Sequence, residues 1–250
     1  MISFDALQAG YGPRAVLKGI SATAKQGELI ALIGPNGCGK STLLKTLCGI
    51  INPSSGTITL DGKPLISLSL KERAKSIAYL AQSRDAMPAM SVRDVVQLGR
   101  APYRGALGKI SSDGQTAIDE AMQKTQSDVF AERRFDELSG GEQARVLLAR
   151  ALAVQAPILL ADEPIAALDP FYQLSMMGTL RAEADSGKTV ITALHDLSLA
   201  AQFANRIWVM YGGRIIASDT PLKALTDDTL KTVFGIRSPK GGFKPLELSD

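Results

Sequence analysis

A glycine-rich segment between a short apolar run and a helical pattern constrains this 250-residue chain most strongly. Glycines let successive backbone N–H groups turn toward phosphate oxygens, and a helix N-terminus adds positive potential. We therefore expect a strand, a phosphate-binding loop and a helix, with Lys40 on the β- and γ-phosphates of a nucleotide and Ser41 on Mg²⁺. Thr42 is expected to bind the nucleotide too, and Cys38 to offer mainly its backbone. The segment reads Gly34-Pro35-Asn36-Gly37-Cys38-Gly39-Lys40-Ser41, followed by Thr42.

Two carboxylates follow a second apolar run, at residues 158–161. In phosphate-loop enzymes an Asp in this place helps to hold Mg²⁺, so we assign that role to Asp162. The next residue, Glu163, is placed to polarise an attacking water molecule. The alternative is a surface turn before Pro164, but carboxyl ends of strands are where open α/β sheets bind ligands.

The order of the patterns indicates the fold class. Apolar or alternating runs at residues 2–7, 16–22, 28–33, 56–60 and 76–80 predict strands, and helical periodicity appears at 91–99, 113–125 and 139–154. From residue 157 onward strand and helix patterns alternate, which favours a mostly parallel sheet covered by helices. Residues 99–105 are expected to form a loop, residues 206–218 a hairpin and residues 225–234 a last helix.

Composition excludes several classes of protein. The net charge of +3 and the isoelectric point of about 8.8 are too mild to indicate a nucleic-acid partner. No run reaches the roughly 18 apolar residues of a membrane span, and the N-terminus lacks a signal-peptide pattern. Two cysteines fit a reducing compartment, and the single histidine excludes a multi-histidine metal site within this chain.

The segment Leu138-Ser139-Gly140-Gly141-Glu142-Gln143 is the most specific feature. Ser139 and Glu142 alone have a simpler explanation, because S-x-x-E is a helix capping box. That explanation does not require two adjacent glycines, which make sense where backbone amides approach a phosphate closely. The segment resembles the Leu-Ser-Gly-Gly-Gln signature of the ATP-binding cassette (ABC) family, with Glu142 in place of the usual Gln.

Further residues resemble marks of that family, in the family's order. Tyr11 resembles the aromatic residue that stacks on adenine, and Gln82 resembles the glutamine that links Mg²⁺ and the attacking water to a membrane partner. Ala167-Leu168-Asp169 resembles the family's D-loop, with Ala166 where Ser is common, and Asp169 is expected to bind the nucleotide. His195 resembles the histidine that contacts the γ-phosphate. Taken singly, each of these residues is more simply explained by packing or solvation.

The resemblance implies a phosphate-loop ATPase at residues 1–237, followed by a tail at residues 238–250. The fold would combine a mostly parallel sheet, an N-terminal antiparallel β subdomain and a helical subdomain inserted at about residues 83–150. The implied ligands are ATP and Mg²⁺. Two cassettes would pair as a homodimer, with each ATP between the phosphate loop of one subunit and Ser139, Gly140 and Gly141 of the other.

With one cassette and no membrane span, the chain resembles the motor subunit of an importer, peripheral on the cytoplasmic face of the inner membrane. Its partners would be permease subunits and, indirectly, a substrate-binding protein. Residues 91–104 and 195–206 resemble importers of iron chelates (siderophores), haem and cobalamin, with siderophores preferred. The 82–104 face would contact the permease, so a charge reversal at Arg100 is expected to weaken assembly and spare basal ATPase activity. The alternatives are a motor for another import substrate or an exporter, and a soluble ABC ATPase acting on DNA or ribosomes.

Overall fold

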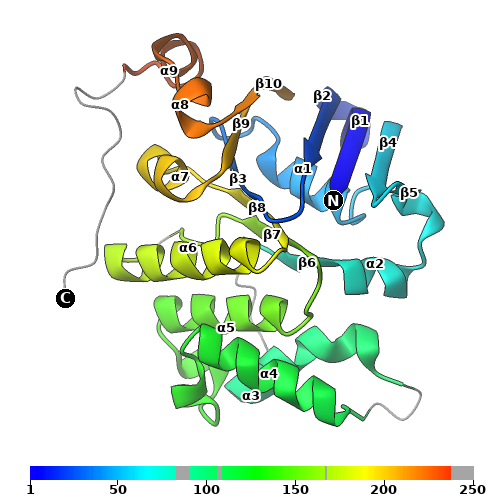
Figure 1. Ribbon diagram of the computed structural model, residues 1–250, viewed down its shortest axis with the longest axis vertical. Helices are drawn as coiled ribbons and strands as arrows, with labels where there is room; N and C mark the ends of the chain where they lie inside the picture. Colours follow the sequence, from blue (N-terminus) through cyan, green and yellow to red (C-terminus); the bar gives the residue numbers. More distant parts are fainter. Residues whose placement is uncertain (83–89, 106–108, 167, 238–250) are drawn as a thin grey trace.

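The computed structural model describes residues 1–82, 90–105, 109–166 and 168–237, and its strands form two sheets (Figure 1). The larger sheet has the order β10-β9-β3-β8-β7-β6. Its strands are parallel except for β10, which pairs antiparallel with β9. The strands are β3 (Leu29–Ile33), β6 (Ile77–Leu80), β7 (Ile158–Asp162), β8 (Thr189–Ala193), β9 (Arg206–Tyr211) and β10 (Arg214–Asp219).

The three central strands of this sheet are buried on both faces. Every residue of β3, β7 and β8 is buried, as expected for continuous apolar runs in a parallel sheet. Successive side chains of β3 enter opposite cores: Leu29, Ala31 and Ile33 belong to one hydrophobic cluster, and Ile30 and Leu32 to the other. The sheet therefore separates two cores, and its loops are anchored from both sides.

The smaller sheet is antiparallel, with the order β2-β1-β4-β5. A register shift in β1 accompanies the left-handed backbone of Ala6, which has a φ of 46°. Phe4 of β1 meets Trp208 of the larger sheet edge to face, with ring centroids 5.6 Å apart. This contact joins the two sheets across the core that also contains α1 (Lys40–Leu47). The strands are β1 (Ile2–Tyr11), β2 (Arg14–Ala24), β4 (Ser55–Leu60) and β5 (Lys63–Pro64).

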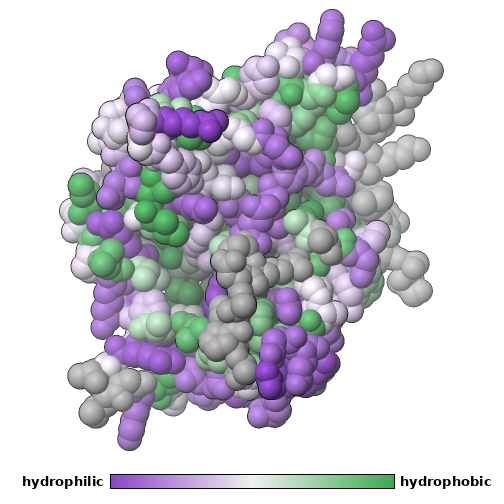
Figure 2. All heavy atoms as spheres, turned by 180° about the vertical axis from the view of Figure 1, so that it is seen from behind, coloured by the Kyte–Doolittle hydropathy of each residue, from purple (hydrophilic) through white to green (hydrophobic). Residues whose placement is uncertain are grey.

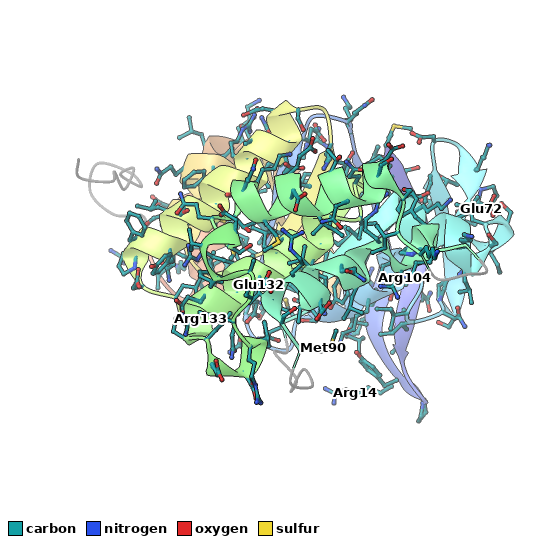
Figure 3. All side chains as sticks on the ribbon, turned by 90° about the horizontal axis from the view of Figure 1, so that it is seen from below. Arg14, Glu72, Met90, Arg104, Glu132 and Arg133 are labelled. Carbon is teal, nitrogen blue, oxygen red and sulfur yellow. The ribbon has the colours of Figure 1, made fainter. Side chains whose placement is uncertain are left out.

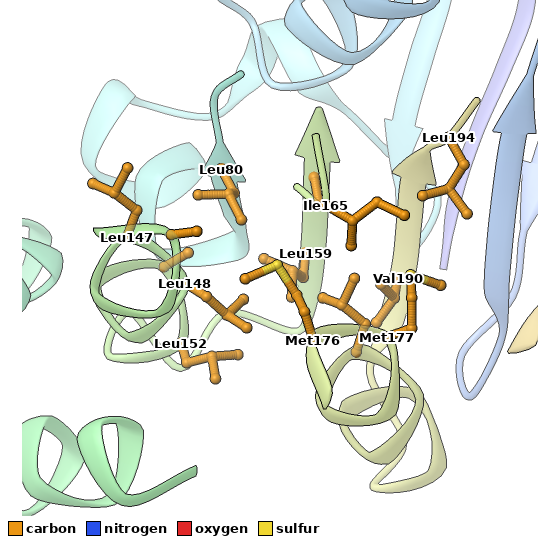
Figure 4. Packing of buried hydrophobic residues seen from close by; sticks show 14 of the residues in the cluster. Leu80, Leu147, Leu148, Leu152, Leu159, Ile165, Met176, Met177, Val190 and Leu194 are labelled. Atoms are coloured by element: carbon orange, nitrogen blue, oxygen red, sulfur yellow. The ribbon is translucent and has the colours of Figure 1, made fainter. Parts of the chain in front are cut away.

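Helices α5 (Gly140–Leu152) and α6 (Pro170–Asp185) cover the other face of the larger sheet. Figure 4 shows Leu147 and Leu148 of α5 beside Leu80 and Met176. Beyond α5 lie α3 (Val92–Gln97) and α4 (Ser112–Lys124), which form a helical layer with it. Polar and apolar side chains interleave over the face seen in Figure 2. The remaining helices are α2 (Leu70–Ser76), α7 (Leu197–Phe203), α8 (Pro221–Ala224) and α9 (Asp227–Phe234), with 3₁₀ turns at Leu65–Ser67, Leu98–Tyr103, Asp128–Phe130 and Phe135–Glu137.

The expected fold class is confirmed, with local corrections. The expected loop at residues 99–105 is largely a 3₁₀ helix, η2 (Leu98–Tyr103), which continues from α3. Helix α2 was not expected, and Ser76 ends it rather than beginning a strand. Its Ser69–Glu72 capping box is the signal that sequence reasoning missed. The expected bounds of the helical insertion, 83–150, begin outside the described residues and remain a prediction, as does the tail at 238–250.

The expectation that Arg100 offers an exposed charge is wrong. Only 5% of the residue is exposed, and its Nη1 donates hydrogen bonds to Ala153 O at 2.8 Å and to Gln155 Oε1 at 3.2 Å. Its guanidinium carbon lies 3.9 Å from the centroid of the Tyr103 ring. Arg100 therefore ties η2 to the end of α5, and it cannot serve as a surface contact for a permease.

Arg100→Glu should consequently destabilise the fold rather than weaken an assembly selectively. The change removes the hydrogen bonds that Nη1 donates to Ala153 O, Val154 O and Gln155 Oε1, and it turns a carboxylate toward those same oxygens. A loss of about 1–3 kcal/mol is expected, because buried oxygens at the end of α5 are left without their donor. Urea unfolding measures this loss, with Lys71→Glu on exposed α2 as the charge-matched control. An Arg100→Glu midpoint equal to that of the control would contradict the assignment.

Candidate active site

The loop between β3 and α1 brings backbone and lysine groups together. A Cβ on Gly34 would lie 2.2 Å from Met210 O, so only glycine fits against β9. Gly39 has a φ of 110° and precedes α1 directly, where its left-handed backbone turns the chain into the helix. The loop is therefore fixed by close packing, and it leads directly into the N-terminus of α1.

Lys40 is held inside this loop. Its side chain is buried, and Nζ donates to Gly34 O at 2.8 Å and lies 3.5 Å from Pro35 O. No carboxylate pairs with Nζ among the residues that the structure describes. The ammonium charge is thus available to an anion that enters the loop.

Ser41 and Asp162 meet at the start of α1. The Ser41 hydroxyl donates to Asp162 Oδ1 at 2.9 Å, and the Tyr79 hydroxyl donates to Oδ2 at 3.1 Å. Burial raises the pKa of the Asp162 carboxyl above its ordinary value, although both hydrogen bonds oppose this shift. Burial and the neighbouring Asp162 charge raise the pKa of the Tyr79 hydroxyl. A hydroxyl and a carboxylate side by side are hard oxygen donors that suit Mg²⁺.

Glu163 lies between the two polar residues expected to act with it. Gln82 Nε2 donates to Glu163 Oε2 at 2.6 Å, and His195 Nε2 lies 2.5 Å from Oε1. The backbone of Glu163 is left-handed, with a φ of 50°, a conformation that costs free energy in a non-glycine residue. Such local strain is common at functional sites. The carboxylate is only 14% exposed and is held in one place from both sides.

A cleft of about 530 Å³ joins these groups. It runs from the exposed ring of Tyr11 along the loop to Gln82, Glu163 and His195. Arg14 and Val16, which sequence reasoning did not single out, line it beside Tyr11. The loop and α1 contribute Asn36, Gly37, Gly39, Lys40, Ser41 and Thr42.

The second set of expected residues lies outside this cleft. Its described lining does not include Ser139, Gly140, Gly141 or Asp169. Ser139 is the N-cap of α5, and its side chain and that of Glu142 form the capping box. Asp169 caps α6 by accepting from Tyr172 N at 3.1 Å. Ser139 and Asp169 thus both lie at helix N-termini, where an anion is favoured. Ala167, the first residue of the expected 167–169 loop, lies outside the described residues.

Sequence reasoning missed Tyr79, Arg14 and Val16 for the same reason. Tyr79 looks like an ordinary strand residue, and it reaches Asp162 because β6 and β7 pair in parallel, with Tyr79 opposite Leu160. Arg14 and Val16 reach the cleft because β2 returns beside the loop. Strand pairing of this kind joins residues that are distant in sequence, and no local pattern predicts it.

Taken together, the loop, the buried lysine and the acid pair after β7 define a phosphate-loop nucleotide-binding protein. Comparison with known proteins specifies the class further, because residues 17–166 match the ABC transporter family. The iron(3+)-hydroxamate import ATP-binding protein of Bacillus subtilis is 36% identical over 236 residues, covering 94% of this chain and 88% of that protein. The hemin import ATP-binding protein of Streptomyces coelicolor is 41% identical over 228 residues, covering 91% and 81%.

A solved structure supports the same assignment. The dimeric structure of a bacterial ABC transporter cassette superimposes with a TM-score of 0.78 at 30% identity, covering 88% of this chain and 99% of that chain. The chain therefore belongs to the ABC transporter family, and it is an ATPase of that family. In the described part of the chain, none of the helices is both long and apolar enough to span a membrane.

Proposed function

We propose that this chain is the ATP-hydrolysing subunit of an importer that takes up an iron chelate, with a siderophore as cargo. The observation that supports hydrolysis is the Glu163 carboxylate, held by Gln82 and His195 at one end of the phosphate-loop cleft. The support for the cargo class is the likeness to import ATP-binding proteins for iron hydroxamate and hemin.

The residues divide the work of hydrolysis between binding and proton transfer. Tyr11 stacks on the adenine of ATP, and the loop amides with Lys40 bind its phosphates. Glu163 accepts a proton from the attacking water, and Gln82 and His195 orient that carboxylate. Catalysis of this kind is mainly positioning and charge stabilisation around the γ-phosphate.

Ser41 and Asp162 would hold Mg²⁺, since their oxygens already lie within hydrogen-bond distance of each other. When bound, the ion supplies positive charge next to the phosphate oxygens. Gln82, the third expected ligand, lines the same cleft as Ser41. Waters and substrate phosphates would complete the coordination of Mg²⁺.

Two copies of the chain would pair head to tail as a homodimer. Ser139, Gly140, Gly141 and Asp169 lie outside the cleft of their own chain, which fits a role on the ATP of a second copy. The helix N-terminus that Ser139 caps supplies amides for an anion. Permease subunits on the cytoplasmic face of the inner membrane, and through them a substrate-binding protein, complete the proposed assembly.

Disruption of the gene tests the cargo. Growth on a ferric siderophore as the sole iron source should fail, while cobalamin-dependent growth continues. The intact gene should restore growth, and a Lys40→Ala copy should not. If growth on haem or on cobalamin fails instead, the cargo is that compound. If growth on all three persists, the proposed cargo class is wrong, although the ATPase activity of the purified chain would be unaffected by that result.

A further inference from the structure

A second hollow, of about 240 Å³, lies between the end of η2 and the start of α4. Three cationic side chains line it, Arg100, Arg104 and Lys109, together with Ser111 and Gly114. It shares no lining residue with the nucleotide cleft. Arg104 lies at the α2 end of the helical layer, away from the end that carries Arg133 (Figure 3). We call this hollow the η2–α4 pocket.

Arg100 is a buried cation, and within the described ranges it has no matching anion. Its Nη1 contacts three neutral oxygens, those of Ala153, Val154 and the Gln155 side chain, and no described atom forms a hydrogen bond with its Nε. Nε lies 3.6 Å from the position of a Cβ on Gly114, so it faces the first turn of α4. A buried charge of this kind costs free energy unless an anion compensates it.

Arg104 and Lys109 add to this uncompensated charge. Arg104 is half-buried and its Nε also lacks a partner in the described part of the chain, whereas Lys109 is exposed. Among the described residues, no ion pair involves Arg100, Arg104 or Lys109. Lys75 increases the local positive charge, because its Nζ lies 4.8 Å from the centroid of the Tyr103 ring. Like charges gathered in one hollow repel each other, and an anion would relieve that repulsion.

The N-terminus of α4 adds positive electrostatic potential to the η2–α4 pocket. Ser111 is the N-cap and accepts a hydrogen bond from Gly114 N at 3.2 Å. Helix α4 has 13 residues, so its first-turn amides carry the partial positive charge of a full helix. Asp113 lies in the first turn but is exposed and does not line the pocket.

We propose that the η2–α4 pocket binds a phosphate group, distinct from the nucleotide at the phosphate loop. A phosphate dianion would compensate two of the three lining cations and offer several acceptor oxygens to guanidinium, ammonium and backbone donors. A single carboxylate would compensate one cation and offer fewer acceptors. The group is a phosphate monoester, either of a soluble compound or of a phosphatidic acid headgroup, because a phosphodiester carries only one negative charge.

Titration of the full chain with inorganic phosphate at constant ionic strength tests this proposal. The backbone amide resonance of Gly114 reports on the pocket, and those of Gly37 and Gly39 report on the phosphate loop. Gly114 should shift along a saturating curve. In Arg104→Gln/Lys109→Gln the midpoint for Gly114 should rise by about tenfold or more, since a charge-assisted hydrogen bond is lost. The buried Arg100 is left in place, so that the pocket variant keeps its fold.

Lys25→Gln/Lys223→Gln removes the same charge from exposed positions and should titrate like the intact chain. Sedimentation with phosphatidic acid vesicles identifies the source of the phosphate. If the pocket variant binds these vesicles less than the control variant does, the group is a headgroup. If both sediment equally, it belongs to a soluble compound. The proposal is overturned if Gly114 does not shift, if the pocket variant titrates like the intact chain, or if acetate shifts Gly114 as readily as phosphate, which would indicate a protein carboxylate.

Discussion

Lys40→Ala is expected to reduce ATP hydrolysis by the purified chain at least about 100-fold, the loss typical of removing one donor from a charge-stabilising site. The reason is the location of Nζ, which is buried in the loop without a carboxylate partner among the described residues. No other described lysine lines the cleft, and its described arginine, Arg14, lies beside Tyr11 rather than in the phosphate loop. Release of inorganic phosphate at saturating Mg-ATP measures the effect.

Lys25→Ala is the control for this change, because it removes an exposed lysine outside the cleft. Circular dichroism should show the same helix content in both variants and in the intact chain. Lys40 donates only to backbone oxygens within its own loop, and its loss leaves both hydrophobic cores untouched. Turnover of the folded Lys40→Ala chain at the rate of the control would contradict the role of Lys40.

Glu163→Gln should slow hydrolysis by about 10²–10⁴-fold, the usual contribution of a general base, while ATP binding persists. The amide keeps the size of the carboxylate and can still accept one hydrogen bond from Gln82, but it cannot take a proton from water. Because bound ATP then survives, the variant should accumulate as a closed dimer. Single-turnover hydrolysis and size-exclusion chromatography with Mg-ATP measure the two effects.

Glu137→Gln removes an exposed carboxylate at the end of the 3₁₀ turn Phe135–Glu137 and should hydrolyse ATP like the intact chain. The two variants have equal net charge, so any difference between them belongs to the place of Glu163 in the cleft. A Glu163→Gln chain that turns over ATP at the rate of Glu137→Gln would remove Glu163 from the reaction.

Much of the sheet could be predicted because its strands are short apolar runs with clear limits. Residues 28–33 and 158–161 mark β3 and β7 closely, since both strands are buried on two faces and are apolar up to the Asp162 that ends β7. The loop after β3 was equally predictable, because its glycines are required by the backbone itself. At Gly34, for example, any side chain would collide with Met210 O.

Other features depend on partners that the sequence does not identify. Arg100 lies in a segment rich in Gly, Pro and charge, which favours an exposed loop, yet the carbonyl groups at the end of α5 bury its guanidinium. Tyr79 reaches Asp162 only through the pairing of β6 with β7. For Arg100 and Tyr79, a tertiary contact therefore decides where the side chain lies, whatever the neighbouring sequence favours.

The expected roles of Ser139 and its neighbouring glycines depend on family resemblance rather than on geometry within one chain. The capping box accounts for Ser139 and Glu142 fully inside the monomer. The predicted action of Ser139, Gly140 and Gly141 on ATP requires a second copy, because these residues lie outside the cleft that contains Lys40. Hydrolysis at a site shared between two chains is therefore the most demanding part of the proposed mechanism.

Mixing two inactive variants measures that sharing directly. Ser139→Arg chains keep an intact phosphate loop, and Lys40→Ala chains keep an intact Ser139 segment. If each ATP lies between two chains, the mixture regains ATP hydrolysis, because a heterodimer contains one site made of the two intact halves. If Ser139 acts within its own chain, both sites of the heterodimer remain damaged, and the mixture hydrolyses no more ATP than either variant alone.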